Sequence, residues 1–198
     1  MINGTSTAIT LALGVAWASG LNLYAAVATL GILGFTGNLD LPQDLMLLHH
    51  PMVIAAAGLM YCVEFVADKI PGVDSTWDTL HTFIRIPAGA ALAAGAVGDV
   101  SPEIQLAAFL LGGSVAAGSH AIKAGTRILI NISPEPFSNW TVSVVEDGLV
   151  IGGITLIALN HTVFLVLLAF FLALSIMKTG PYSTRHCLLS RSDLTLID

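Results

Sequence analysis

The chain has 198 residues, of which 55% are hydrophobic and 10% are charged, and its formal net charge is −6. Soluble domains carry about 25% charged residues, so this composition argues against a water-soluble fold. Apolar segments of about 20 residues recur, which is the length that crosses a hydrocarbon core of roughly 30 Å. We therefore expect an all-α, polytopic membrane helix bundle in contact with the lipid bilayer. The chain has no basic tract, which argues against nucleic acid as a partner.

Six transmembrane helices are predicted in chain order. They cover roughly residues 6–35, 51–69, 77–98, 103–128, 141–159 and 162–178, with turn-forming residues between them. The boundary between the last two rests only on Asn160 and His161, but the 38 residues from 141 to 178 are too many for a single crossing. We expect residues 1–179 to form one integral membrane domain and residues 180–198 to form a cytoplasmic tail.

The first predicted helix is too long for one crossing and has poor helix formers near its middle. These are Ser19, Gly20 and Asn22, and glycine alone costs about 1 kcal/mol relative to alanine in a helix interior. One interpretation is a helix broken at Ser19 and Gly20, which would expose backbone groups at bilayer depth as in many transporters. The other is an ordinary tilted helix whose small residues pack closely against a neighbour.

Two short similarities within the chain suggest an internal repeat. Residues 14–22 (GVAWASGLN) resemble residues 113–121 (GSVAAGSHA). Because the first and fourth predicted helices run in opposite directions, this pairing would form an inverted repeat. Residues 75–77 (STW) resemble residues 138–140 (SNW), and this pairing would form a parallel repeat instead. Both similarities are too short to decide between the two.

The basic residues predict the orientation. With six spans, all seven Lys and Arg residues fall on one face, and the opposite face carries Asp40, Asp44, Asp99 and Glu103. The positive-inside rule then places the face with the basic residues in the cytoplasm, and both termini with it.

Charged and polar side chains recur at helical spacing near the predicted cytoplasmic helix ends. The sets are Glu64 and Asp68 (i, i+4), Asp78, His81 and Arg85 (i, i+3, i+7), and His120, Lys123 and Arg127 (i, i+3, i+7). These spacings put each set on one helix face. Two further acids, Glu146 and Asp147, follow about two turns into the fifth predicted helix. We expect all of these side chains to face the interior of the bundle.

Two interpretations of these residues remain open. One is an interhelical salt-bridge network that fixes packing, and the other is a polar vestibule that binds a charged solute or relays protons. A magnesium site with oxygen ligands is a weaker option, because the spacing of the acids matches no known ligand motif and basic residues compete for them. We therefore predict neither a metal nor another cofactor.

The same segments resemble a family of small bacterial inner-membrane proteins described only as a domain of unknown function. The resemblance is carried by "GLNLY" (20–24), "EFVADKIPGVD" (64–74), "TFIRIPAGA" (82–90), "HAIKAGTR" (120–127) and "SVVED" (143–147). It covers roughly residues 14–160 and implies a multi-pass protein of the bacterial inner membrane without an established activity. The matching elements include Lys69 and Asp74 in addition to most of the polar residues named above.

The predicted function is a small transporter or channel-like protein for an unidentified small solute or ion. The predicted pathway residues are Asn22, Glu64, Asp68, Asp78, His81, Arg85, His120, Lys123, Arg127, Glu146 and Asp147, with the helix break at Ser19 and Gly20. One alternative is a non-catalytic assembly or scaffold subunit, in which the charges are structural. Another is a magnesium-dependent membrane enzyme that acts on lipid headgroups, although an enzyme is the less expected class. A homo-oligomer is compatible with each of these functions.

Overall fold

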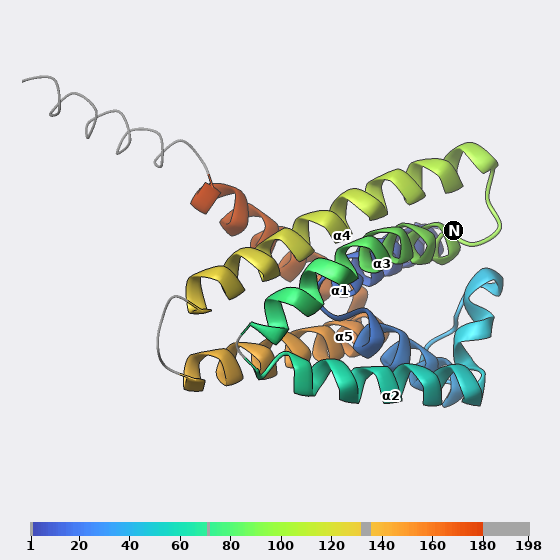
Figure 1. Cartoon of the computed structure of the whole chain (residues 1–198). Coiled ribbons are helices and arrows are strands. Elements are labelled where there is room, and N and C mark those ends of the chain that lie inside the picture. Colours follow the sequence, from blue (N-terminus) through green and yellow to red (C-terminus); the bar gives the residue numbers. More distant parts are fainter. Residues whose placement is uncertain (1, 71, 132–135, 180–198) are drawn as a thin grey trace, which may run out of the picture. The chain divides into compact units, whose positions relative to one another are not determined.

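The protein is described by a computed structural model that covers residues 2–70, 72–131 and 136–179. Its helices are α1 (Ile2–Phe35), the 3-10 helix η1 (Gln43–His49), α2 (Pro51–Ala67), α3 (Val73–Ala96), α4 (Pro102–Asn131) and α5 (Pro136–Thr179), as Figure 1 shows. The described residues contain no strand, and the predicted all-α bundle is confirmed. The chain divides into two compact units, Met1–Phe164 and Leu165–Asp198, and the features below lie in the first. The predicted tail, 180–198, is outside the described residues.

Three helices are long and apolar enough to cross a membrane by length and composition, which identifies a membrane protein. They are Thr5–Phe35, Pro102–Ile130 and Phe137–Leu174. A fourth span would be the pair formed by Gln43–His49 and Pro51–Ala67, which is bent by 67°. The count is lower than the predicted six partly because the fifth and sixth predicted helices are both contained in α5.

α1 is broken at Asn22, whose backbone is extended (φ −149°, ψ 99°) within an otherwise helical segment. Its side chain is the N-cap of the second arm, since Oδ1 accepts a hydrogen bond from the backbone N–H of Ala25 at 2.9 Å. The broken helix is therefore the correct interpretation of the sequence. The break was predicted at Ser19 and Gly20, but both of these lie in helix, and the extended residue comes two positions after Gly20.

The first arm of α1, residues 2–21, runs antiparallel to α3. Near the break, the hydroxyl of Ser19 donates to the backbone carbonyl of Arg85 at 2.9 Å. Far from the break, Ile9 lines the same cavity as Val97. The residue numbers on α1 therefore fall as those on α3 rise.

The second arm, residues 23–35, runs parallel to α3. Tyr24 lies beside His81, with 3.2 Å between the hydroxyl and Nε2. Further along, Val27 lines a groove together with Leu92. Because the two arms follow the same helix in opposite directions, α1 folds back on itself at Asn22, so residues 6–35 do not form one straight helix.

The fold-back places the Asn22 turn inside the bundle. Arg85 on α3 and Lys123 on α4 lie at the level of the turn, since both bond to the end of the first arm. At about 1.5 Å per residue, α3 begins about 18 Å before Arg85, and α4 continues about 12 Å beyond Lys123. Both ends of α1 therefore lie at the opposite end of the bundle from the starts of α3 and α5. This removes the basis for the expectation that the N-terminus shares a face with Lys69.

The fold-back also excludes the inverted repeat. The carbonyl of Trp17 accepts a hydrogen bond from Ser119, and the carbonyl of Leu21 accepts one from Lys123, at 2.9 and 3.0 Å. The first arm of α1 and α4 therefore run in the same direction, not in opposite directions as the inverted repeat requires. The parallel pairing of residues 75–77 with 138–140 stays a prediction.

α5 has a second break, at Asn160 (φ −159°, ψ 90°), and its side chain likewise caps the following turn. A Cβ built on Gly153 would lie 3.3 Å from the ring of Phe164. Eleven residues of continuous helix would hold the two about 16 Å apart along the axis, so the chain turns back between them. The boundary predicted at Asn160 and His161 therefore coincides with a real break.

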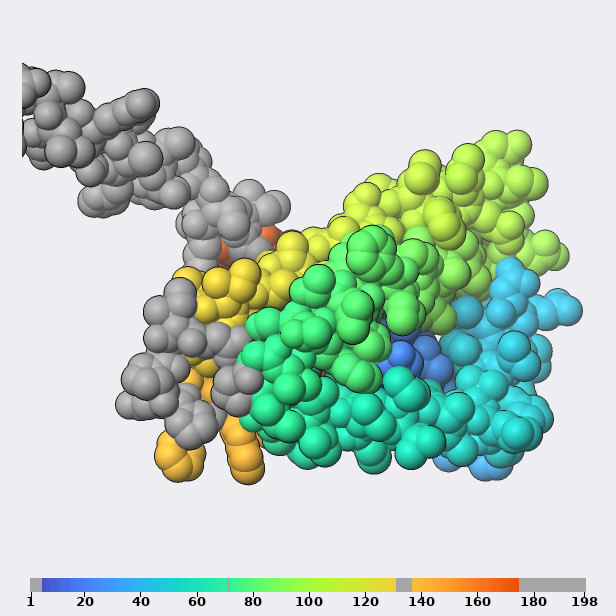
Figure 2. All heavy atoms as spheres, in the orientation of Figure 1, coloured from blue at the N-terminus to red at the C-terminus, as the bar shows by residue number. Residues whose placement is uncertain are grey.

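α1 forms the centre of the first unit. Most of it is buried, mainly as alanine, glycine and leucine, and small residues allow the close helix approach that membrane bundles use. Most of the apolar span of α4 is exposed, as expected for a helix that faces lipid. In Figure 2, part of α1 is visible through a gap between α2 and α3, where an apolar groove of about 400 Å³ separates the two helices.

Candidate functional site

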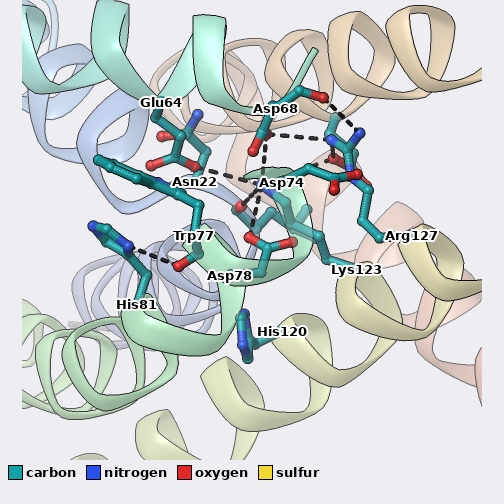
Figure 3. A network of polar contacts seen from close by, with 12 residues as sticks. Asn22, Glu64, Asp68, Asp74, Trp77, Asp78, His81, His120, Lys123 and Arg127 are labelled. Carbon is teal, nitrogen blue, oxygen red and sulfur yellow. Dashed lines mark hydrogen bonds and ion pairs between the residues drawn. The ribbon is translucent and has the colours of Figure 1, made fainter. Parts of the chain in front are cut away.

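Beyond the Asn22 turn, the bundle is filled by buried charged side chains, which we call the charge network (Figure 3). Its members are the cations Arg85, Lys123 and Arg127 and the acids Glu64, Asp68, Asp74, Asp78, Glu146 and Asp147, each at most 8% exposed. They come from α3, α4 and α5, and from the end of α2 with its connection to α3. The helical spacing in the sequence therefore placed each set on the correct, inward face.

Lys123 joins the break in α1 to the network. Its ammonium donates to the carbonyl of Leu21 at 3.0 Å, to Asp68 at 2.9 Å and to Glu64 at 3.4 Å. The carbonyl of Leu21 belongs to the last turn of the first arm, where carbonyls lack helical partners and the helix dipole favours a cation. Lys123 thus stabilises the broken end of α1.

Arg85 holds two acids from different elements. Nη2 donates to Glu64 at 2.6 Å and Nη1 donates to Asp78 at 2.8 Å. Nη1 also lies 3.3 Å from Nδ1 of His120, and because a guanidinium only donates, that nitrogen carries no proton. Nε2 of His120 then donates to the hydroxyl of Thr82 at 2.7 Å, so this histidine is neutral.

Arg127 connects the network to the start of α5. Nη2 donates to Glu146 at 2.7 Å and to Asp68 at 3.2 Å, and Nη1 donates to the side-chain oxygen of Asn139. Asn139 in turn donates to Asp74 at 3.4 Å. Sequence reasoning missed Asn139, because a neutral residue next to Trp140 reads as an interfacial position.

Asp147 is held by neutral side chains. Oδ1 accepts a hydrogen bond from Nδ2 of Asn22 at 2.9 Å, and Oδ2 lies 3.4 Å from the hydroxyl of Tyr61. The amide of Asn22 therefore caps the second arm of α1 with one atom and binds α5 with the other. Tyr61, on α2, is the second site residue that the sequence did not reveal.

His81, one of the predicted pathway residues, is buried beside the charge network, and its hydrogen bonds go to Trp77 and Tyr24. Its Nδ1 donates to the carbonyl of Trp77 at 2.9 Å, and its ring stacks on Trp77 with 4.1 Å between centroids. Nε2 is then free of a proton and accepts from Tyr24. His81 therefore helps to hold the second arm of α1 in place through its hydrogen bond with Tyr24.

Lys69 marks the rim of the network, in the connection between α2 and α3. Its ammonium lies over the ring of Phe65 and donates to the carbonyl of that residue at 3.0 Å. Partial burial lowers the pKa of Lys69 below its ordinary value. It supplies positive potential near Asp68 and Asp147 without contacting either of them.

A cavity of about 140 Å³ reaches the network between α3 and α4. Its polar lining includes Asp78, Thr82, His120 and Arg127, so hydrogen-bond donors and acceptors both face it. No group of three or more His, Cys, Asp or Glu side chains is arranged to hold a metal ion in the described parts of the chain.

The apolar helices, the broken α1 and the buried charges together define an integral membrane protein of the helix-bundle class. The chain belongs to the family described as a domain of unknown function (DUF4126), whose sequence model matches residues 9–179. The resemblance inferred from the sequence is confirmed, and the match extends beyond the predicted 14–160 at both ends. No curated protein and no solved structure matches the chain.

Proposed function

We propose that this protein is a small transporter or channel-like protein for a small polar solute or ion, and that the charge network controls passage. The observation that carries the proposal is the Asn22 turn. There the first arm of α1 ends inside the bundle, and the carbonyl of Leu21 accepts a hydrogen bond from Lys123. Helices broken at bilayer depth supply backbone groups to substrates and coupling ions in many transporters.

The cost of burying charge supports a function beyond packing. An aspartate, lysine or arginine at the bilayer centre costs about 2.5–3.5 kcal/mol on insertion scales. Replacing buried ion pairs by apolar residues of similar volume is often neutral or stabilising, so packing alone is a weak reason to keep them. Ionisable residues at this depth usually serve a solute or ion pathway.

The cavity between α3 and α4 is the proposed approach to the network. Asp78 supplies an acceptor group there and Arg127 supplies a donor group. A small solute with both a donor and an acceptor group, such as a zwitterion, complements this lining. We propose the inner membrane as the location, with the network end in the cytoplasm because Lys69, Lys123 and Arg127 gather there.

A non-catalytic assembly subunit is the second candidate, and the close pairing of the network favours it. Lys123 alone donates to three acceptors, which is what a rigid structural core requires. The two candidates differ in what Glu64→Gln should do. Neutralising a structural acid leaves Arg85 buried without full compensation, at a cost of about 3–5 kcal/mol, whereas a transport acid is needed for flux.

The test uses purified protein in liposomes on a solid-supported membrane. Currents are recorded on rapid addition of glycine, phosphate, sodium or potassium, with protein-free liposomes as the blank. The proposal expects a current with at least one of these probes in the wild type, loss of that current in Glu64→Gln, and its retention in Glu103→Gln, an exposed acid at the opposite end of α4. A wild type without current, together with a Glu64→Gln variant that loses only stability, would favour the assembly subunit.

A further inference from the structure

The charge network contains more acids than bases. Its six carboxyl groups face three cations, and adding the half-buried Lys69 makes only four. His120 does not close the difference, because it accepts from Arg85 and is neutral. Buried groups with uncompensated negative charge bind protons instead of remaining ionised. Some of the six carboxyl groups in the network therefore carry protons.

Five of the six acids lie beside a cation or at a helix N-terminus, and both positions stabilise a negative charge. Four lie within 4 Å of a guanidinium or ammonium group, namely Glu64, Asp68, Asp78 and Glu146. The fifth, Asp74, accepts the backbone N–H groups of Gly72 and Ser75 at the start of α3, where the helix dipole favours an anion.

Asp147 is the exception. Its hydrogen-bond partners among the described residues are the amide of Asn22 and the hydroxyl of Tyr61, which are both neutral. It is 5% exposed, and the charged groups around it are Asp68 and Lys69 after α2, Lys123 on α4 and Glu146 beside it on α5. Lys123 and Lys69 favour an ionised Asp147 and Asp68 opposes it, but neither lysine forms an ion pair with it, so Asp147 lacks the direct cation contact that four of the other acids have.

We propose that Asp147 is a proton-binding site, protonated in this conformation and deprotonated when the broken end of α1 moves. When Asp147 is ionised, the Tyr61 hydroxyl donates to Oδ2. Protonation of Oδ2 reverses this bond, because Oδ2–H then donates to the hydroxyl, and Oδ1 accepts from Asn22 in both states. On deprotonation the Oδ2 proton is released to water that enters when the broken end of α1 moves. This inference rests on the proposed transport function, for which it names the proton as the coupling ion.

Infrared difference spectroscopy of the full chain in lipid tests the site without any solute. Spectra are taken in acidic and alkaline buffer, and the C=O stretch of a protonated carboxyl group is followed. We expect Asp147→Asn to lose one such band, and Asp44→Asn, an exposed acid in η1, to retain the wild-type spectrum. Carboxyl bands unchanged in Asp147→Asn would overturn the proposal.

Tyr61→Phe keeps the carboxyl group and removes only its hydroxyl partner, so it serves even if Asp147→Asn does not fold. The same band should persist at a shifted frequency, and an unshifted band would overturn the assignment to Asp147. A wild type that shows the band but carries no solute would contradict the transport function alone. Solute flux that is independent of a proton gradient, with no band, would contradict the proton site alone.

Discussion

The side-chain amide of Asn22 ties the break in α1 to Asp147 on α5, with 2.9 Å between Nδ2 and Oδ1. Its other atom, Oδ1, caps the second arm by accepting from Ala25, also at 2.9 Å. One residue thus ends one helix, starts another and binds a third. Any change at the network that moves Asp147 is therefore transmitted directly to the fold-back of α1.

Asn22→Ala should destabilise the protein more than the equivalent change at the other break. Loss of the cap costs about 1 kcal/mol, and the lost partner of buried Asp147 adds about 1–3 kcal/mol. Asn160→Ala is the matched control, because Asn160 also caps a helix but is exposed, so about 1 kcal/mol is expected there. Denaturant titration in micelles measures both, and equal losses would contradict the role given to Asn22.

Gly20→Ala should disrupt the contact between α1 and α4. A Cβ at this position would overlap Ser119 Oγ and the backbone carbonyl of Ala116, and a backbone atom cannot move aside cheaply. We expect a loss of about 1–3 kcal/mol in the free energy of unfolding, as for other overpacked cores.

Gly118→Ala on the same α4 helix is the control for Gly20→Ala, because a Cβ there meets nothing within 4 Å. This change should leave stability unchanged or raise it by up to about 1 kcal/mol, from the better helix propensity of alanine. If Gly20→Ala and Gly118→Ala change the free energy of unfolding equally, α1 and α4 do not approach each other as closely as described.

The fold-back predicts a membrane topology that differs from the expectation based on six spans. Thr5 should lie on the same side as Asn38, and Ile70 on the opposite side, whereas six full crossings put Thr5 with Ile70. Single cysteines at these positions, in a chain without Cys62 and Cys187, can be labelled with an impermeant maleimide before and after lysis of spheroplasts. Joint labelling of Thr5→Cys and Ile70→Cys from one side would contradict the fold-back.

The inward face of each charged helix could be predicted from sequence, because charges at i, i+3 and i+7 are confined to one face. Arg85, Lys123 and Arg127 were found in this way, and all three are fully buried. The fold-back could not be predicted in the same way. A single extended residue at Asn22 leaves the apolar pattern on both sides intact, so periodicity continues across it.

The neutral partners in the site also escaped prediction. Tyr61 and Asn139 acquire their importance only from what they face, namely Asp147 and Arg127. His81 was predicted for the opposite reason: it shares the spacing of Asp78 and Arg85, but its stacking on Trp77 draws it away from them. Spacing identifies a helix face, and the neighbouring helices decide which side chains on that face meet.

If the charge network controls passage and does not merely hold the helices together, loss of one acid should abolish flux without loss of stability. Glu146→Gln tests it most directly, because Glu146 is the most exposed member of the network and its amide can still accept from Arg127. Flux in liposomes and the unfolding midpoint are measured on one preparation, with Glu103→Gln as the control. We expect a folded Glu146→Gln protein whose unfolding midpoint is near that of the wild type and whose solute current is lost. A lowered midpoint with the current intact would contradict it.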